Sequence, residues 1–348
     1  MSKKRIVTGI GVVLLTTGVI GGIWSGILAM PKVINNVQIA QDKLNKEEVL
    51  YKGEFNLSKL NINSKVSNVI IRKYDGKNVI VERSGNKDSS TITTKEDNNE
   101  LTINEETKHN NISSKSIDDM VRYFLNEMYK PYYSKITVYV PENINIDVNT
   151  DHGQLYIDDI DVNNLNYNTS YGSISLNENS NIDNLNIKSY GNISLKVREV
   201  YSTNNLNIEC SDLNIYENTI INDNYKIPEN VKILIDNDYI DDEDDSVVID
   251  TNLPIAKNLD ITSNETVELN LPILNYKFNF NIKALNGIYV DADSKNKYLD
   301  TTLEKYLELD DDINRLNNHT FEGLINGKFA NDSSEYFVNI KGANVEFK

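Results

Sequence analysis

A glycine recurs every 19 residues in the middle of this 348-residue chain, at Gly153, Gly172 and Gly191. Each glycine precedes a short segment in which apolar and polar residues alternate, such as Ser173-Ile174-Ser175-Leu176. A second feature also recurs, since the tripeptide Asn-Leu-Asn occurs at 164–166, 184–186 and 205–207. A fixed period near 20 residues indicates one supersecondary unit that is repeated and that buries its apolar face against its neighbours.

Each repeat is predicted to contain two β-strands. Before the glycine or its equivalent, every second residue is apolar or small; these residues are Leu165, Tyr167 and Thr169, then Leu185, Ile187 and Ser189, then Leu206, Ile208 and Cys210. A period of two places these side chains inward and the asparagines outward. Cys210 is therefore predicted to be a small inward residue rather than a reactive thiol.

Two arrangements of the repeat fit this alternation. A two-residue hairpin at Tyr171-Gly172 would pair Thr169 with Ile174 on one face. In a solenoid, the chain would instead bend at the glycine and stack each strand on its equivalent in the next coil. One repeat alone does not separate them. The near-constant period favours stacking, because equivalent residues then meet about every 4.8 Å.

Charge and cysteine content exclude several classes of protein. The net charge of −17 and the pI near 4.7 argue against binding to nucleic acid or to an anionic lipid surface, both of which require a basic face. They are typical of a soluble extracellular region. Cys210 is the single cysteine, which excludes a disulfide within the chain and a cysteine metal cluster. We expect no cofactor.

The N-terminus is predicted to be a membrane anchor. Lys3-Lys4-Arg5 precede an uncharged run of 25 residues at 6–30, long enough to cross a bilayer as a tilted helix. The basic cluster predicts a cytoplasmic tail at 1–5 and an extracellular location for the rest, in a single-pass protein of the cell membrane. The alternative is a cleaved signal peptide, whose apolar region is normally shorter, at about 7–15 residues.

The part of the chain outside the membrane divides into a stalk and a repeat domain. Residues 31–53 are predicted to form a helical spacer, because Val33, Val37, Ala40 and Leu44 have a brief coiled-coil-like spacing. Residues 54–348 are predicted to form an all-β repeat domain. Apolar residues at helical spacing predict two short helical insertions in it, near 116–130 and near 300–309.

Taken together, the strand–glycine-turn–strand units, the entry strand Ile136-Thr-Val-Tyr-Val-Pro141 and the anchor resemble the bacterial putative-adhesin family. That family has a β-strand-repeat domain of unknown molecular function. The resemblance runs from about Phe55 to Phe347, although segment 236–270 departs from the pattern. It implies a right-handed parallel β-helix-like solenoid and a role at the cell envelope, in adhesion or in envelope stress. It supplies no catalytic residues.

Few residues stand out as candidate sites. Tyr171 and Tyr190 follow equivalent strands, and exposed aromatic rings on one turn edge are candidates for binding a sugar ring or a partner side chain. Gly153, Gly172 and Gly191 are predicted structural turn residues. In the acidic run 236–245, Asp236, Asp238 and Asp241 are weak candidates for Ca²⁺, because the run lacks the spacing and glycine of an EF-hand.

The sequence therefore favours a membrane-anchored binding module without catalysis, with cell-wall glycan, a host surface or another membrane protein as partner. A regulatory sensor of an envelope-stress system is the alternative. A polysaccharide-active β-helix enzyme is third, and it rests on fold analogy alone.

Overall fold

The computed structural model describes residues 46–54, 56–76, 78–85, 90–107, 134–177, 179–217, 226–235, 246–291, 298, 300–303, 307–308, 315–316, 319–330 and 334–348. The chain divides into two compact units. One comprises 1–48, 84–90 and 108–134, and few of its residues are described. The other, which comprises 49–83, 91–107 and 135–348, carries the repeats, and its described residues form mainly β-strands together with one short helix and a helical residue at Tyr298.

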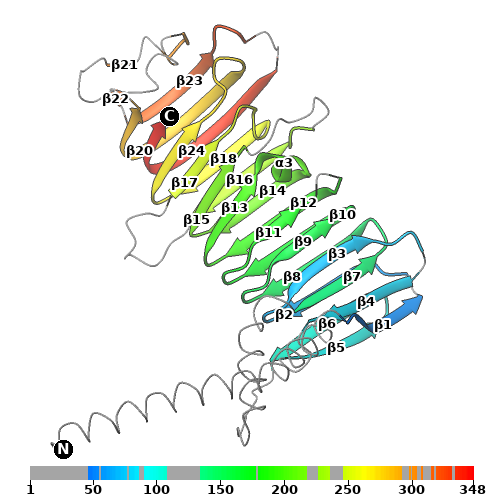
Figure 1. Ribbon diagram of the computed structural model, residues 1–348. Coiled ribbons are helices and arrows are strands. Elements are labelled where there is room, and N and C mark those ends of the chain that lie inside the picture. The colour runs from blue at the N-terminus through cyan, green and yellow to red at the C-terminus, as the bar shows by residue number, and fades with distance from the viewer. Residues whose placement is uncertain are drawn as a thin grey trace, which may run out of the picture. The chain divides into compact units, whose positions relative to one another are not determined.

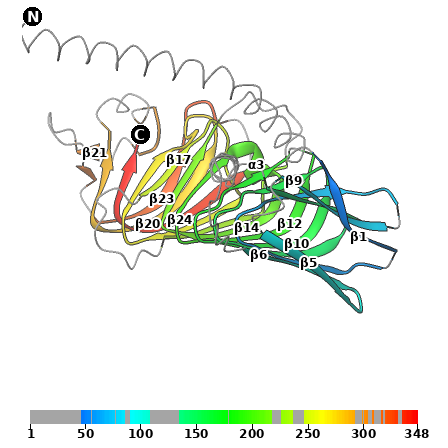
Figure 2. The same cartoon turned by 60° about the horizontal axis from the view of Figure 1, so that its bottom comes forward.

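Most of its strands belong to two parallel ladders, in which consecutive repeats lie side by side (Figure 1, Figure 2). The first ladder contains, in spatial order, β6 (Glu100–Thr107), β2 (Lys59–Ser64), β8 (Ile144–Thr150), β10 (Asp161–Thr169), β12 (Asn181–Ser189), β14 (Thr203–Cys210), β16 (Asn230–Ile235), β18 (Asn258–Ser263), β24 (Glu335–Phe347) and β20 (Lys277–Val290). β23 (Thr320–Asn326) pairs antiparallel with β20 at the end of this ladder.

The second ladder has two paired parts. The first contains β7 (Lys135–Val140), β3 (Asn68–Lys73), β9 (Leu155–Asp158) and β11 (Ile174–Leu176). The second contains β13 (Asn192–Lys196), β15 (Asp212–Tyr216), β17 (Ser246–Asp250) and β19 (Thr266–Asn270), and β13 lies next to β11 although the two strands belong to different sheets. β1 (Glu48–Glu54) and β4 (Asn78–Ser84) extend it beside β7. β5 (Ser90–Asp97) precedes β6 across the turn at Asn98-Asn99.

Pairing between repeats shows stacking rather than a hairpin. β10 pairs in parallel with β8 and β12, in a register that sets Leu165 opposite Leu185, while β11 pairs in parallel with β9. The residues after Thr169 therefore carry the chain from one ladder to the other instead of reversing it. In the last coils, β20 and β24 each contribute to both ladders as one long strand, and the register of their pairing shifts between Ala284 and Gly287. Such an irregularity bends a strand without a loop.

The core lies between the ladders. The inward positions predicted from the alternation are buried, and equivalent residues stack as Ile146, Leu165, Leu185, Leu206, Val231, Leu259 and Val338. Cys210 is buried at an inward position of β14, as expected from the repeat. Because parallel strands lie about 4.8 Å apart, each side chain contacts its equivalents in both neighbouring coils.

Two expectations about local structure need correction. The stalk is not helical up to 53, because β1 begins at Glu48, and Leu50 and Tyr51 pack against the core; the coiled-coil-like spacing ends at Leu44. The described part of 300–309 is not helical either. There, β21 (Leu307–Glu308) pairs with β22 (Arg315–Leu316), and Leu303 is buried in the core.

Segment 236–270, which departs from the repeat pattern, still supplies β17, β18 and β19 in register with both ladders. One helix was not anticipated, α3 (Val197–Tyr201), which lies between β13 and β14.

The predicted anchor at 6–30 and the helical insertion near 116–130 lie outside the described residues. No helix among the described residues has the length and hydropathy to cross a bilayer.

Candidate functional site

The outward side of the first ladder carries three columns of hydrogen-bonded amide side chains, which we call the asparagine face. In the Asn145 column, each Nδ2 donates to the Oδ1 of the preceding coil at 2.7–3.1 Å; its members are Asn145, Asn164, Asn184, Asn205, Asn230 and Asn258. The strand register forces this column, because these residues are aligned in successive parallel strands. The six amides therefore form one continuous chain of hydrogen bonds.

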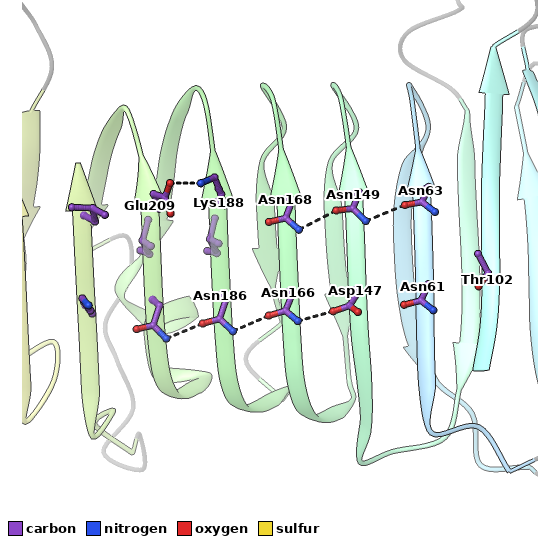
Figure 3. Close-up of a pocket in the computed structure, with 15 residues that line it drawn as sticks. Asn61, Asn63, Thr102, Asp147, Asn149, Asn166, Asn168, Asn186, Lys188 and Glu209 are labelled. Carbon is purple, nitrogen blue, oxygen red and sulfur yellow. Dashed lines mark hydrogen bonds and ion pairs between the residues drawn. The ribbon is translucent and has the colours of Figure 1, made fainter. Parts of the chain in front are cut away.

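Two further columns run beside it, two and four residues along each strand. The Asp147 column consists of Asp147, Asn166, Asn186 and Asn207, with donor–acceptor distances of 2.6–2.8 Å. The Asn149 column consists of Asn104, Asn63, Asn149 and Asn168, with distances of 2.7–3.0 Å. Figure 3 shows both columns crossing neighbouring strands. An amide inside a column, such as Asn166 or Asn186, uses one N–H and one lone pair along the column. In the Asn145 column, the Nδ2 groups of Asn184, Asn205 and Asn258 also donate to backbone carbonyls at 3.2–3.5 Å, so the free N–H groups lie mainly in the other two columns.

This face is hollowed over the Asp147 and Asn149 columns, where an open cavity of about 810 Å³ is lined by polar residues and three aliphatic ones: Asn61, Asn63, Thr102, Asp147, Asn149, Asn166, Asn168, Asn186, Lys188, Asn207, Glu209 and Lys232, with Ile187, Ile208 and Leu234 (Figure 3). Its charges are mostly paired, because Lys188 bonds Glu209 and Lys59 Nζ lies 2.9 Å from Asp147 Oδ2. Partial burial opposes ionisation of Asp147, but hydrogen bonds from Asn166 and Lys59 outweigh it and lower the pKa of its carboxyl. The cavity is thus polar and nearly neutral.

Tyr190 lies at the rim of the asparagine face. It lines an adjoining hollow of about 360 Å³ together with Asn149, Asn168 and Lys188. Tyr190 is 70% exposed and Tyr171 69% exposed, so both rings can be reached by a ligand. The ring of Tyr171 stacks on His152 of the preceding coil, with centroids 5.6 Å apart and planes 9° apart. Of the two candidates, Tyr190 is therefore the one that borders the amide columns.

The three repeat glycines lie in connections between the ladders, but none has a positive φ; the described glycine that does is Gly85. A lack of space for a side chain explains the glycines at 153 and 172 instead. A Cβ at Gly153 would lie 2.2 Å from the carbonyl oxygen of Ser67, and a Cβ at Gly172 would lie 2.3 Å from that of Gly153. Close approach of backbone in successive coils requires glycine at these two positions.

The Ca²⁺ candidates Asp236, Asp238 and Asp241 lie outside the described residues. Among the residues that the structure describes, no group of three or more His, Cys, Asp or Glu side chains is placed to hold a metal ion.

Sequence reasoning placed asparagines outward but missed their connection into columns. The visible signal was the tripeptide at 164–166, 184–186 and 205–207. It omits Asn145, Asn230 and Asn258, whose membership depends on the pairing of strands with different spacing along the chain.

Comparisons with known proteins found a matching family and similar solved structures. Residues 57–287, more than half of the chain, match the family described as Toastrack DUF4097. Two solved structures are similar, a putative cell adhesion protein from Clostridium sporogenes and a putative adhesin from Bacteroides fragilis. The first has 13% identity and a TM-score of 0.22, and the alignment covers 87% of this chain and 99% of that one. The second has 9% identity and a TM-score of 0.35, with coverage of 87% and 96%. At these scores neither structure bears on the site. No curated protein matches the sequence.

Proposed function

We propose that this chain, which belongs to the Toastrack DUF4097 family, is a non-catalytic binding module of the cell envelope that holds an extended, hydroxyl-rich polymer on its asparagine face. The observation that carries the proposal is the chain of amide hydrogen bonds along the Asn145 and Asp147 columns. The fold that presents it is proposed to be a right-handed parallel β-helix-like solenoid over 54–348.

The amide columns are suited to such a ligand because they are ordered before it arrives. A free asparagine side chain loses rotamer entropy on binding, whereas an amide already held on both sides has little left to lose. The columns repeat about every 4.8 Å across the strands, so a polymer with regularly spaced hydroxyls meets many weak sites at once. A cell-wall glycan has this chemistry.

Tyr190 complements the amides with an aromatic surface. Sugar rings have apolar faces as well as hydroxyls, and an exposed phenol ring beside Asn149 and Asn168 offers a surface on which a ring can stack. The near neutrality of the cavity, with Lys188 bonded to Glu209 and Lys59 to Asp147, favours an uncharged polymer over an ionic one.

The proposed location follows from the N-terminal sequence. The uncharged run 6–30 would anchor the protein in the cell membrane, with 1–5 in the cytoplasm and the binding module outside. Alkaline carbonate washing of membranes should leave the full-length protein in the pellet and release a form that starts at residue 31. Release of the full-length protein would contradict anchoring.

Binding is tested with the full-length protein in detergent micelles against an array of neutral and acidic glycans. We expect binding to neutral glycans. Tyr190→Ser should then weaken affinity for the strongest of them about 5- to 10-fold, the usual value of one aromatic contact. Tyr171→Ser is the matched control, since that ring is equally exposed but does not line the hollow. Failure to bind any neutral glycan, or equal effects of the two variants, would contradict the proposed site.

A further inference from the structure

A second hollow lies on the outward side of the second ladder, away from the asparagine face. It has a volume of about 500 Å³ and lies over β7, β3, β9 and β11, next to α3; its lining includes Asn68, Ile70, Arg72, Lys135, Tyr156, Asp158, Ser175, Asn177 and Arg198. The strand register explains how residues distant in sequence meet there. Ile70, Tyr156 and Ser175 are aligned across three neighbouring strands. Arg72 is aligned with Asp158, and Asn177, which follows β11, is hydrogen-bonded to Asp158. We call this site the basic hollow.

The basic hollow contains more cations than anions, although the chain carries a net charge of −17. Arg72 Nε lies 2.9 Å from Asp158 Oδ2, and Asn177 Nδ2 donates to the other oxygen of Asp158 at 2.8 Å. Asp158 therefore neutralises Arg72 and has both oxygens occupied. Lys135 and Arg198 have no anionic partner among the residues that the structure describes.

Arg198 is the most informative of these cations. Its Nε is buried and has no hydrogen-bond partner within the described part of the chain. The neighbouring carboxylate of Glu199 does not serve it, because that group accepts hydrogen bonds from Ser175 Oγ at 2.9 Å, Lys196 N at 2.8 Å and Leu176 N at 3.3 Å. A buried guanidinium N–H without an acceptor is unfavourable, and an oxyanion bound in the hollow would supply the acceptor.

The rest of the lining is neutral and partly apolar. Tyr156 is 36% exposed, and its neighbour in register, Ile70, is half-buried, so together they offer an aromatic and aliphatic floor. Asn68 and Ser175 lie beside that floor. A ligand that matches this site has a ring for the floor, hydroxyls for the polar side chains and one oxyanion for the guanidinium.

We propose that the basic hollow binds the carboxylate of an acidic sugar, with Arg198 and Lys135 contacting the carboxylate and Tyr156 stacking on the sugar ring. The site is separate from the asparagine face, so this proposal can be tested independently of the neutral-polymer proposal. A protein with both sites would hold a mixed glycan by two different chemistries.

The test is titration calorimetry of the full-length protein in detergent micelles with oligogalacturonate at low salt. Arg198→Gln should weaken binding at least 10-fold and Lys135→Ala about 3-fold, and both losses should shrink as NaCl screens the charges. Lys283→Ala, which removes an exposed lysine of β20 that lines neither hollow nor the asparagine-face cavity, is the matched control and should leave the affinity unchanged.

Three results would overturn the proposal. The first is equal affinity for the reduced, uncharged galactose oligomer. The second is wild-type affinity in both Arg198→Gln and Lys135→Ala. The third is displacement of oligogalacturonate by inorganic phosphate at lower concentrations than by free galacturonate, which would identify phosphate rather than carboxylate as the ligand group. Lys135 is exposed, so its variant remains informative if Arg198→Gln fails to fold.

Discussion

Gly172 lies against the carbonyl group of Gly153 in the preceding coil, so closely that a Cβ at Gly172 would be 2.3 Å from the Gly153 oxygen. The same oxygen accepts a hydrogen bond from the hydroxyl of Tyr167 at 3.0 Å, and Gly172 N donates to Thr169 Oγ1 at 2.7 Å. Thr169 in turn lies 3.0 Å from Thr150 of the coil before, through their hydroxyl oxygens. The 19-residue glycine period thus coincides with a buried polar network that connects consecutive coils.

The first prediction concerns this contact. Gly172→Ala should lower the free energy of unfolding by about 2–3 kcal/mol, because backbone and two side-chain oxygens would have to move. Gly191→Ala should cost less than about 1 kcal/mol, because the nearest atom is a ring carbon of exposed Tyr171, 3.2 Å away. Denaturant unfolding followed by circular dichroism measures both. Similar costs for the two variants would show that turn conformation, and not the stacking distance, determines the glycine period.

The second prediction concerns Glu105, which is buried in β6 and accepts hydrogen bonds from the backbone N–H groups of residues 65–67 at 2.9–3.1 Å. The hydroxyls of Ser64 and Ser67 also donate to it. Glu105→Gln should destabilise the protein by about 2–4 kcal/mol, because a neutral amide loses the charge that strengthens the four bonds to Oε2 and its nitrogen cannot accept from Ser67 Oγ. The matched control is Glu100→Gln on the exposed side of the same strand, which should change stability by less than about 0.5 kcal/mol. Thermal melts compare them, and a shift no larger than the control's would contradict the assignment.

The third prediction concerns the cooperativity of the amide columns. Asn186 donates to Asn166 and accepts from Asn207, both at 2.8 Å, whereas Asn168 ends its column with one bond to Asn149 at 3.0 Å. Asn186→Ala should therefore cost about 1–2 kcal/mol of stability and Asn168→Ala about half as much. Equilibrium unfolding in urea gives both values. A larger loss at Asn168 than at Asn186 would be incompatible with columns held by amide–amide bonds.

The fourth prediction is an alkaline transition. Burial raises the pKa of the Cys210 thiol from 9.0 to about 12. Below pH about 9 the thiol is neutral in both the folded and the unfolded chain, so it adds no pH dependence. Between pH 9 and 12 only the unfolded chain ionises, so stability should fall by up to about 1.4 kcal/mol per pH unit from this group. Cys210→Ser should remove that component when urea unfolding is repeated from pH 8 to 11, and an identical slope in both proteins would rule it out.

Much of the strand content could be predicted, because the alternation of apolar and polar residues shows which side chains point inward even when the partner strands are unknown. Leu165, Tyr167 and Thr169 are buried at the predicted inward positions of β10. Where the prediction was wrong, tertiary contacts decided. Residues 48–53 and 307–308 form strands because partners are available for their backbone, and no local pattern records that availability.

The candidate site was predictable only in part. Tyr190 was visible as an aromatic residue at an equivalent turn, but its position at the rim of the amide columns depends on how β12 pairs with β10. The basic hollow left no signal along the chain, since Lys135, Tyr156 and Arg198 lie far apart in sequence and meet only through the pairing of β7, β3, β9 and β11 and the position of α3.

The sequence by itself determined the unit of this protein, an inward-facing apolar alternation with a glycine or its equivalent after each strand, because these patterns depend on local geometry. The tertiary structure decided how the units are joined. Parallel pairing with equivalent residues in register joins outward asparagines such as Asn164 and Asn184 into a column, and it requires glycine where Gly172 lies against Gly153. Register is a relation between strands, and hydrogen bonds across 20 or more residues form only once that relation is fixed.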